Sequence, residues 1–394
     1  MNERANKPLR VLIVSPRFYP YQGGVQTHVY EVSRRLVRAG ADVTVLTTTV
    51  DRRLPAEDQL EGIDIRRVRA WPAKRDYYFA PAIGRVIAQG GWDVVHVQSY
   101  HTLVAPLAML AALRANIPYV LTFHGGGHSS RLRQALRQIQ WLLLRPLLAR
   151  ASRLVATARF ETPLYGRKLK LPSEQFVFIP NGGDLGALPA SMLAAEAATP
   201  GAVDSTLVAS VGRLERYKGH HRVIEALPTL LEYEPNIHLW IAGAGPYEPD
   251  LRRLAQRLGV ADHIEIRAIP PADRQGLARE LSRAALVTLL SEYETHPMAA
   301  LEAIALGRPL LVADTSGLSE LAEQGYARAI PLNSSPEDVA MAMLGQLRAP
   351  LLPGRIALPS WDACASDLLT LYHEVLQERG DSQRRQTIAQ KLLS

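Results

Sequence analysis

The chain has 394 residues, 47% of them hydrophobic, and its 45 Lys and Arg outnumber its 38 Asp and Glu to give a net charge of +7. This length exceeds what one hydrophobic core normally supports, so we expect two domains. The single cysteine, Cys364, excludes an internal disulfide and suits the cytosol. We expect no signal peptide, because Met1 to Lys7 is polar, and no membrane span, because no apolar run approaches about 18 residues.

In chain order, short β-rich runs alternate with helical segments, a pattern that predicts an α/β fold built on parallel sheets. In the first half we expect strands near residues 11–15, 43–47, 94–98, 119–123, 154–156 and 176–179. In the second half we expect strands near residues 207–211, 238–242, 264–268, 286–290 and 310–312. Each half then forms a doubly wound, Rossmann-like sheet, and the two sheets face a cleft lined by the loops at the strand carboxyl ends.

Composition also marks the domain boundaries. Residues 185–204 are rich in Ala, Pro and Ser and carry no strand signal, which indicates a linker. We predict a first domain over residues 1–190, a linker region over 191–204, a second domain over 205–360, and a C-terminal helix with a basic tail over 361–394.

Three loops of the first half contain glycines beside polar residues. They are Pro20-Tyr-Gln-Gly-Gly-Val25, Thr122-Phe-His-Gly125 and Ile179-Pro-Asn-Gly-Gly-Asp184. His124 and His128 have the i, i+4 spacing of some zinc sites. The three glycines between them disfavour a helix, however, and no third ligand is evident, so we predict no metal site.

The first half is strongly basic. Residues 1–184 hold 26 Lys and Arg against 13 Asp and Glu, a net charge of +13, whereas residues 185–394 have a net charge of −6. The densest part has no acidic residue and is interleaved with Leu, Ile and Trp; its arginines are Arg131, Arg133, Arg137, Arg145, Arg150 and Arg153. Such a segment either lies on an anionic membrane surface or packs on its sheet with the arginine heads reaching water. We favour the membrane, and we expect no nucleic-acid partner because no such motif occurs.

Two cations follow the first strand of the second half. Arg213 and Lys218 lie five positions apart in the loop after residues 207–211, and Gly219 opens the next helix. Both can reach one diphosphate, Arg as a planar fork and Lys as a point charge. The alternative is a solvated basic turn. The next loop, Gly243-Ala-Gly245-Pro246, lacks the third glycine of a dinucleotide fingerprint; it indicates a close backbone approach or an ordinary left-handed turn.

Two carboxylates flank a predicted helix start. Glu294 lies in the loop after the strand at residues 285–290, Pro297 fits the first helical turn, and Glu302 lies inside the helix. The unpaired N–H groups between the two carboxylates form an anion site, and carboxylates on either side suit hydroxyl groups, so a sugar nucleotide fits. The alternative is a Glu294 that complements the helix dipole and a solvated Glu302.

Taken in order, these landmarks resemble the retaining glycosyltransferases of family 4, which have the two-domain GT-B fold. The landmarks are the Gly23-Gly24-Val25 loop, the Thr122 to Gly125 turn, the Asn181 loop, the Arg213/Lys218 loop, the Gly243 loop and the Glu294-x7-Glu302 motif. The resemblance covers nearly the whole chain. It implies transfer of a sugar from a nucleoside diphosphate sugar, such as a UDP-sugar or GDP-sugar, to an acceptor hydroxyl, with the donor on the second domain, the acceptor on the first, and the last helix crossing back to the first.

The resemblance also assigns roles to residues. Glu302 would hold the ribose hydroxyls, Glu294 a hydroxyl of the donor sugar, and Arg213 with Lys218 the leaving diphosphate. His124 would lie beside the donor sugar, with its ring or its backbone carbonyl near the developing positive charge. The other donor-binding residues would be Gly23, Gly24, Gly243 and Gly245. No protein nucleophile is evident, and the family is thought to use front-side attack.

The sequence departs from the family after Glu294, where an aromatic residue and a glycine are usual. Here Thr295, His296 and Pro297 follow. Pro297 lacks an N–H, so diphosphate contacts shift to Met298 and Ala299 or depend more on the two cations. His296 becomes a donor-side specificity contact.

No cofactor besides the nucleotide sugar is expected, and no metal, because no Asp-x-Asp carboxylate cluster occurs. The acceptor would be a glycan or a lipid-linked sugar. The protein would be cytoplasmic, either free or peripheral on the inner face of the cell membrane. Two other functions stay open: a GT-B-fold nucleotide-sugar epimerase or hydrolase, and a non-catalytic nucleotide-sugar-binding protein.

Overall fold

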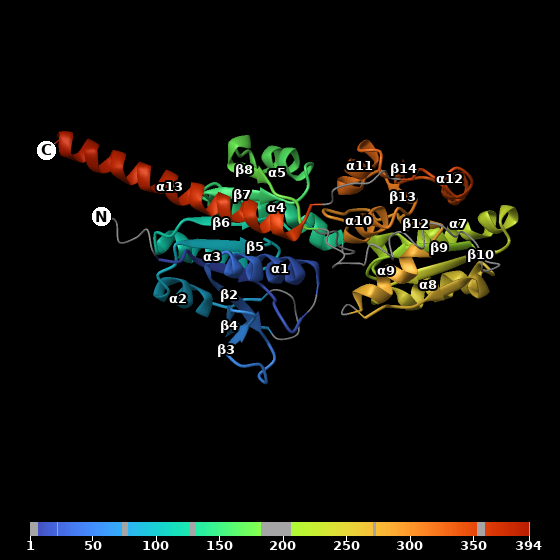
Figure 1. Cartoon of the computed structure of the whole chain (residues 1–394), viewed down its shortest axis with the longest axis horizontal. Helices are drawn as coiled ribbons and strands as arrows, with labels where there is room; N and C mark the ends of the chain where they lie inside the picture. Colours follow the sequence, from blue (N-terminus) through green and yellow to red (C-terminus); the bar gives the residue numbers. More distant parts are fainter. Residues whose placement is uncertain are drawn as a thin grey trace. The chain divides into compact units, whose positions relative to one another are not determined.

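The computed structural model describes residues 7–21, 23–72, 78–125, 131–182, 206–270, 273–352 and 359–393. The chain divides into two compact units (Figure 1). Unit 1 contains residues 1–125, 135–182 and 359–394, and unit 2 contains residues 126–134 and 183–358. The predicted linker, residues 191–204, lies outside the described residues.

Unit 1 is built on a mostly parallel sheet. Its strands are β1 (Arg10–Ser15), β2 (Asp42–Thr49), β3 (Glu57–Leu60), β4 (Ile63–Arg69), β5 (Val94–Gln98), β6 (Tyr119–Thr122), β7 (Arg153–Ala156) and β8 (Phe176–Phe178). Their order across the sheet is β3-β4-β2-β1-β5-β6-β7-β8. Among the described strands, β3 pairs antiparallel with β4 and the other pairs are parallel. The loops after β1, β5, β6 and β7 therefore leave the sheet along one edge.

Helices cover both faces of this sheet because the side chains of β1 alternate between two cores. Leu12 and Val14 point into a core with α2 (Ala82–Gln89), α3 (Val104–Arg114), α4 (Arg131–Leu148) and α5 (Glu161–Leu169). Val11 and Ile13 point into a core with α1 (Gly24–Arg38) and α13 (Trp361–Leu393). This is the doubly wound arrangement that was predicted.

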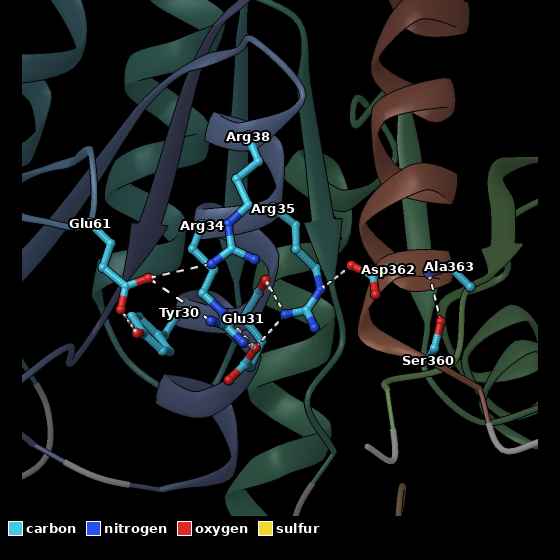
Figure 2. Close-up of polar contacts among 9 residues, drawn as sticks. All are labelled: Tyr30, Glu31, Arg34, Arg35, Arg38, Glu61, Ser360, Asp362 and Ala363. Atoms are coloured by element: carbon cyan, nitrogen blue, oxygen red, sulfur yellow. Dashed lines mark hydrogen bonds and ion pairs between the residues drawn. The ribbon is translucent and has the colours of Figure 1, made fainter. Parts of the chain in front are cut away.

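The last helix, α13, packs on α1 within unit 1. Leu368 and Tyr372 are fully buried, and the Tyr372 hydroxyl lies 2.6 Å from His96 Nδ1. On the surface, Arg35 Nε of α1 donates to Asp362 Oδ1 at 2.6 Å, and Glu31 holds the same guanidinium (Figure 2). The first part of α13 is thus built into the core of unit 1.

Unit 2 has a parallel sheet. Its strands are β9 (Thr206–Val211), β10 (Ile237–Ala242), β11 (Ile264–Ile266), β12 (Leu286–Leu289), β13 (Leu310–Ala313) and β14 (Arg328–Ile330). Their order is β11-β10-β9-β12-β13-β14, so β9 lies between β10 and β12. One face carries α7 (His220–Tyr233), α8 (Glu248–Arg257) and α12 (Pro336–Arg348). The other carries α9 (Arg274–Ser282), α10 (Met298–Ala305) and α11 (Ser316–Glu323).

Each of the predicted strands coincides with a strand of the structure, and the predicted α/β class is confirmed. The sequence missed β3, β4 and β14. All three include exposed positions: β3 and β14 are edge strands of their sheets, and β4 lies next to β3. Among the helices in the described ranges, none is both long and apolar enough to cross a membrane.

Candidate active site

In unit 2, the loop after β9 packs directly on the end of β12. Gly219 has φ of 76°, and a Cβ added there would lie 2.0 Å from the carbonyl oxygen of Leu290. Only glycine meets both requirements, a left-handed backbone and the absence of a side chain. The close approach places Lys218 beside the residues that follow β12.

Lys218 and Glu294 form a half-buried ion pair. Lys218 Nζ lies 2.5 Å from Glu294 Oε1, and the side chains are 15% and 12% exposed. Ser291 Oγ donates to the same carboxylate oxygen at 2.9 Å. The backbone of Glu294 is also fixed, because its N–H donates to Ser316 Oγ at 2.8 Å and its carbonyl accepts from Gly317 N–H at 2.8 Å. The sequence named both charges but did not predict that they pair.

The pair retains groups for a ligand. An ammonium has three N–H donors, so Lys218 can hold Glu294 with one and a phosphate with another. Both contacts to the Glu294 carboxylate fall on Oε1, and within the described part of the chain Oε2 makes no hydrogen bond. The two groups therefore present a cation and a hydroxyl acceptor next to each other.

Tyr217 links the two cations, and sequence reasoning missed it. Its hydroxyl accepts from Arg213 Nη2 at 2.7 Å, and Lys218 Nζ lies 5.5 Å from its ring centroid. Tyr217 is only 5% exposed, whereas Arg213 is exposed. A buried phenol thus anchors one end of an otherwise solvent-facing guanidinium. The signal in the sequence was an aromatic residue between the two cations.

The glycine loop after β10 supports the Arg213 loop. A Cβ on Gly243 would lie 1.9 Å from the Gly212 carbonyl oxygen, and one on Gly245 would lie 2.4 Å from that of Leu214. Leu214 N–H donates to Ala244 O at 3.0 Å across this contact. Neither glycine is among those with positive φ, so the left-handed turn considered above is wrong. The close approach is that of one protein loop to another.

His220 links the end of β9 to the Arg213 loop. Its Nδ1 lies 2.8 Å from Ser210 Oγ, and its Nε2 lies 3.3 Å from the Arg213 carbonyl oxygen. Burial lowers the pKa of His220 to about 4, so the imidazole is neutral at pH 7. The histidine therefore holds the backbone of Arg213 without adding charge.

The start of α10 differs from the prediction. Pro297 precedes the helix instead of lying in its first turn. Met298 N–H donates to the His296 carbonyl at 2.9 Å, so the shift of diphosphate binding to this N–H is not supported, and among the predicted N–H groups Ala299 remains. Glu302 is 2% exposed, which excludes the solvated alternative. His296 lies beside this turn and is partly buried.

In unit 1, His124 follows β6 and its ring is fixed at one end. Nε2 lies 2.7 Å from Gln98 Oε1, and because an amide oxygen only accepts, Nε2 carries the proton and Nδ1 the lone pair. Burial holds the pKa of His124 well below its usual value. The His124 carbonyl accepts from His101 Nε2 at 2.9 Å. Of the two groups predicted to face the donor sugar, the carbonyl is thus occupied by His101, whereas no residue in the described ranges forms a hydrogen bond with the ring at Nδ1.

Two further residues join His124, and sequence reasoning did not assign them a role. His28, on α1, lies with its ring centroid 4.8 Å from that of His124. Asn181 Oδ1 lies 2.7 Å from His28 Nδ1. Gly23 and Gly24, at the start of α1, are exposed. The signal for His28 was its position one turn after the glycine pair; His128 lies outside the described residues.

Glu161 is a buried carboxyl group close to the His124 turn. Its Oε2 accepts from the N–H of Thr157 at 2.8 Å and of Ala158 at 3.3 Å, and a backbone contact from Gly125 also acts on it. Burial outweighs these hydrogen bonds and raises the pKa of Glu161 to about 8. At neutral pH this group is therefore mostly protonated.

Comparisons with known proteins agree with this arrangement. The model described as Glycosyltransferase Family 4 matches residues 22–186, and that described as Glycosyl transferases group 1 matches residues 196–350. A D-inositol 3-phosphate glycosyltransferase of Kribbella flavida is 30% identical over 353 residues, which cover 82% of this chain and 81% of the relative. The enzyme of the same name from Nocardiopsis dassonvillei is 28% identical over 94% of this chain and 95% of its own.

Solved structures show the same fold. Sucrose-phosphate synthase from Thermosynechococcus elongatus has a TM-score of 0.68 at 20% identity over 98% of this chain and 100% of its own. HepE of Anabaena, in complex with UDP and glucose, has a TM-score of 0.68 at 16% identity over 96% of this chain and 100% of its own. The fold and the two loops of unit 2 thus define a glycosyltransferase of the GT-B type. The chain belongs to glycosyltransferase family 4, as the resemblance of its landmarks predicted.

The buried ionisable groups give the stability of the protein a pH dependence of known sign. Because the pKa of Glu161 is raised from 4.5 to about 8, the folded protein keeps a proton there that the unfolded chain releases, and the free energy of unfolding falls as pH rises through this window. Buried histidines act in the opposite sense up to about one unit above pH 6.5, because their pKa values are lowered to about 3 or 4; they are His28, His96, His220 and His221. The contribution of Glu161 is therefore obtained as the difference between the wild type and a variant that lacks this carboxyl group.

We predict that the free energy of unfolding of the wild type falls relative to that of Glu161→Gln between pH 6.5 and 8, by at most about 1.4 kcal/mol per pH unit from this one proton. Urea unfolding followed by tryptophan fluorescence at four pH values in the window measures it. Glu174→Gln, at an exposed site of the same unit, is the control and should keep the wild-type slope. Equal slopes for wild type and Glu161→Gln would contradict the assignment.

Proposed function

We propose that the protein transfers a sugar from a nucleoside diphosphate sugar to an acceptor hydroxyl with retention at the anomeric carbon. The Lys218–Glu294 ion pair is the observation that carries this proposal. A nucleotide sugar has a diphosphate directly beside a hydroxylated ring, and the pair offers a cation directly beside a hydroxyl acceptor. HepE of Anabaena, which shares the fold, was solved with UDP and glucose and with UDP-glucose.

In the proposed reaction, the bond between the anomeric carbon and the diphosphate oxygen breaks while the acceptor oxygen attacks from the same face. The acceptor proton passes to the leaving phosphate oxygen, so no protein base is required. Arg213 and Lys218 stabilise the negative charge that develops on the diphosphate, which is the largest electrostatic demand of the step. Glu294 orients the sugar through a hydroxyl, and Glu302 holds the ribose hydroxyls.

His124 supports the same step from unit 1. Its ring is neutral and its proton is on Nε2 toward Gln98, so Nδ1 presents a lone pair. A lone pair, unlike an imidazolium, stabilises the positive charge that develops on the sugar ring. Gly23 and Gly24 are exposed at the start of α1, where their backbone can approach the phosphate and the sugar closely.

The acceptor is proposed to be anionic. Residues 1–184 have a net charge of +13, which favours a negatively charged partner. The relatives from Kribbella and Nocardiopsis are named for inositol 3-phosphate, a phosphorylated polyol. Two sources of such chemistry are a soluble phosphorylated polyol and an anionic lipid or lipid-linked sugar, and we propose the second because of the surface of α4.

Helix α4 has one buried and one exposed apolar face. Trp141, Leu144 and Leu148 pack into the core of unit 1, as expected for a helix on its sheet. On the other face, Leu142 and Leu143 are each 71% exposed, and Ile139 is 56% exposed. Exposed leucines beside basic residues suit the boundary of an anionic membrane.

The structure reduces the number of arginines available for this contact. Arg153 pairs with Glu378 of α13, an acidic residue outside the basic segment. Arg145 Nε donates to the Leu169 carbonyl at 2.7 Å, and both Arg145 and Arg150 are exposed. The side chains of Arg131, Arg133 and Arg137 lie outside the described residues.

The first prediction concerns the two cations proposed to hold the diphosphate. Arg213→Ala or Lys218→Ala should lower turnover by about 10²-fold or more, because each removes a preorganised charge at the leaving group. Glu302→Ala should instead weaken nucleotide binding. Transfer assays with a panel of nucleoside diphosphate sugars measure the first effect, and thermal shift measures the second, since a ligand at 100 times its Kd adds about 2.7 kcal/mol of stability.

Arg216→Ala, an exposed cation of the same loop, is the matched control and should keep wild-type turnover. Wild-type turnover of the Arg213→Ala, Lys218→Ala double variant would refute the site. Consumption of the donor at the same rate without any acceptor would favour the hydrolase or epimerase, and binding without turnover would favour a non-catalytic protein.

We predict that transfer does not require a divalent metal ion. Arg213 and Lys218 supply the charge that such an ion supplies in other phosphate-transfer sites, so transfer should continue in the presence of EDTA. Within the described residues no three His, Cys, Asp or Glu side chains gather into a group that would hold a metal ion. The measurement is the initial rate with and without chelator. A complete loss that magnesium or manganese restores would contradict the prediction.

We predict that the protein binds anionic membranes. It should co-sediment with anionic vesicles at low salt more than with neutral vesicles, since each basic residue near an anionic surface contributes about 1 kcal/mol to the binding free energy. Leu142→Glu, Leu143→Glu should abolish this binding, and reversal of Arg131, Arg133 and Arg137 to Glu should weaken it. Tyr233→Glu, Met341→Glu, which alters two exposed apolar residues of unit 2, is the control. Equal recovery with both vesicle types would make a soluble phosphorylated polyol the better acceptor.

A further inference from the structure

His28 is a buried histidine with one ring nitrogen satisfied and the other not. It is 2% exposed. Asn181 Oδ1 lies 2.7 Å from Nδ1, and because an amide oxygen only accepts, Nδ1 carries the proton. Nε2 then holds the lone pair, and among the described residues it has no hydrogen-bond partner. Burial lowers the pKa of His28 to about 4, which keeps the ring neutral.

A second buried histidine of the same unit shows what a purely structural role looks like. His96 is fully buried, and both of its ring nitrogens have partners, Tyr372 OH at 2.6 Å and Thr122 Oγ1 at 2.7 Å. The unpaired Nε2 of His28 instead carries a desolvation cost that an apolar side chain of similar size would avoid. Stability alone therefore does not explain an imidazole at position 28.

The ring of His28 packs edge-to-face against two other rings. The His124 centroid lies 4.8 Å away at an interplanar angle of 68°, and the Trp361 centroid lies 5.8 Å away at 64°. Tilted ring pairs at these distances have a preferred geometry. Gln98 holds the Nε2 end of His124. His28 adds a contact at a second point, so two independent contacts fix the orientation of that ring.

The partners of His28 lie where the chain leaves unit 1 and where it returns. The chain leaves after Asn181 and Gly182 and returns at residues 359–361. A Cβ on Gly182 would lie 2.4 Å from Trp361, so the outgoing and returning segments touch. Arg35 lies about two helical turns after His28, and its ion pair with Asp362, the residue after Trp361, joins α1 to α13 (Figure 2). His28 is thus held on one side by the outgoing segment and on the other by the returning one.

We propose that His28 is a positioning residue for His124, and that Asn181 and Trp361 hold His28 in the orientation that this requires. The proposal rests on the proposed role of His124 at the donor sugar. His28 does not contact substrate in this account. It sets the direction of the His124 lone pair. A misplacement of a catalytic group by about 1 Å can cost about 10²-fold in rate.

The first test compares kinetic constants. His28→Ala should lower kcat by about 10–100-fold and leave the KM for the donor within about twofold, because most of the proposed donor contacts lie on unit 2. Asn181→Ala should lower kcat in the same way by a smaller factor. The control is Leu36→Ala, a cavity-forming change at a 1% exposed site of the same helix. It should lower the melting temperature without lowering kcat at a temperature well below melting.

The second test needs no substrate. Nitrogen NMR of the imidazole groups should show His124 as the Nε2–H tautomer in the wild type. His28→Ala should shift or broaden the His124 resonances, and Leu36→Ala should not. If His28→Ala does not fold, Asn181→Ala serves the same comparison, because it removes the group that fixes the His28 tautomer.

The two tests separate this proposal from the proposed function. Unchanged His124 resonances in His28→Ala, or a kcat no lower than that of Leu36→Ala in an active enzyme, would overturn the positioning role. Shifted His124 resonances in a protein that transfers no sugar would support the positioning role and overturn the proposed function instead.

Discussion

The arrangement of unit 2 depends on one constraint, the half-buried ion pair between Lys218 and Glu294. Removing one member of such a pair would leave an uncompensated charge away from water, which is strongly destabilising. The loops on both sides are therefore built to keep the pair closed. Gly219 lets the lysine loop rest on Leu290, and Ser316 fixes the backbone at the glutamate. Because β9 and β12 are adjacent and parallel, both loops leave the sheet at the same edge.

The two units provide different chemistry. Unit 2 gathers charged groups, two cations and a carboxylate, held by Tyr217 and Ser291. Unit 1 gathers neutral imidazoles, because burial lowers the pKa of His28 and His124 and so keeps these two rings uncharged. In the proposed reaction, negative charge develops on the leaving diphosphate and positive charge develops on the sugar ring.

The C-terminal helix α13 completes the core of unit 1 beside α1. It fills the groove beside α1 with apolar residues, and its Tyr372 satisfies a ring nitrogen of the buried His96. Its first residue, Trp361, contacts both Gly182 and His28. The return of the chain to unit 1 thus adds a core contact and a contact to His28.

The sequence by itself determined the α/β class and the position of each predicted strand, because buried parallel strands are continuous apolar runs that local pattern reports directly. It also named Arg213, Lys218, Glu294 and His124, since each follows a strand. It did not reveal β3, β4 or β14, whose exposed positions weaken the apolar pattern.

Only the tertiary structure decided which residues meet. Lys218 and Glu294 are 76 residues apart, and His28 and Asn181 are 153 residues apart. Arg153 finds its partner Glu378 on the last helix, 225 residues away, which removed one arginine from the predicted basic surface. Strand order and helix packing set such contacts, and neither is written in the local periodicity of the chain, because a periodic pattern records which face of an element is buried but not what buries it.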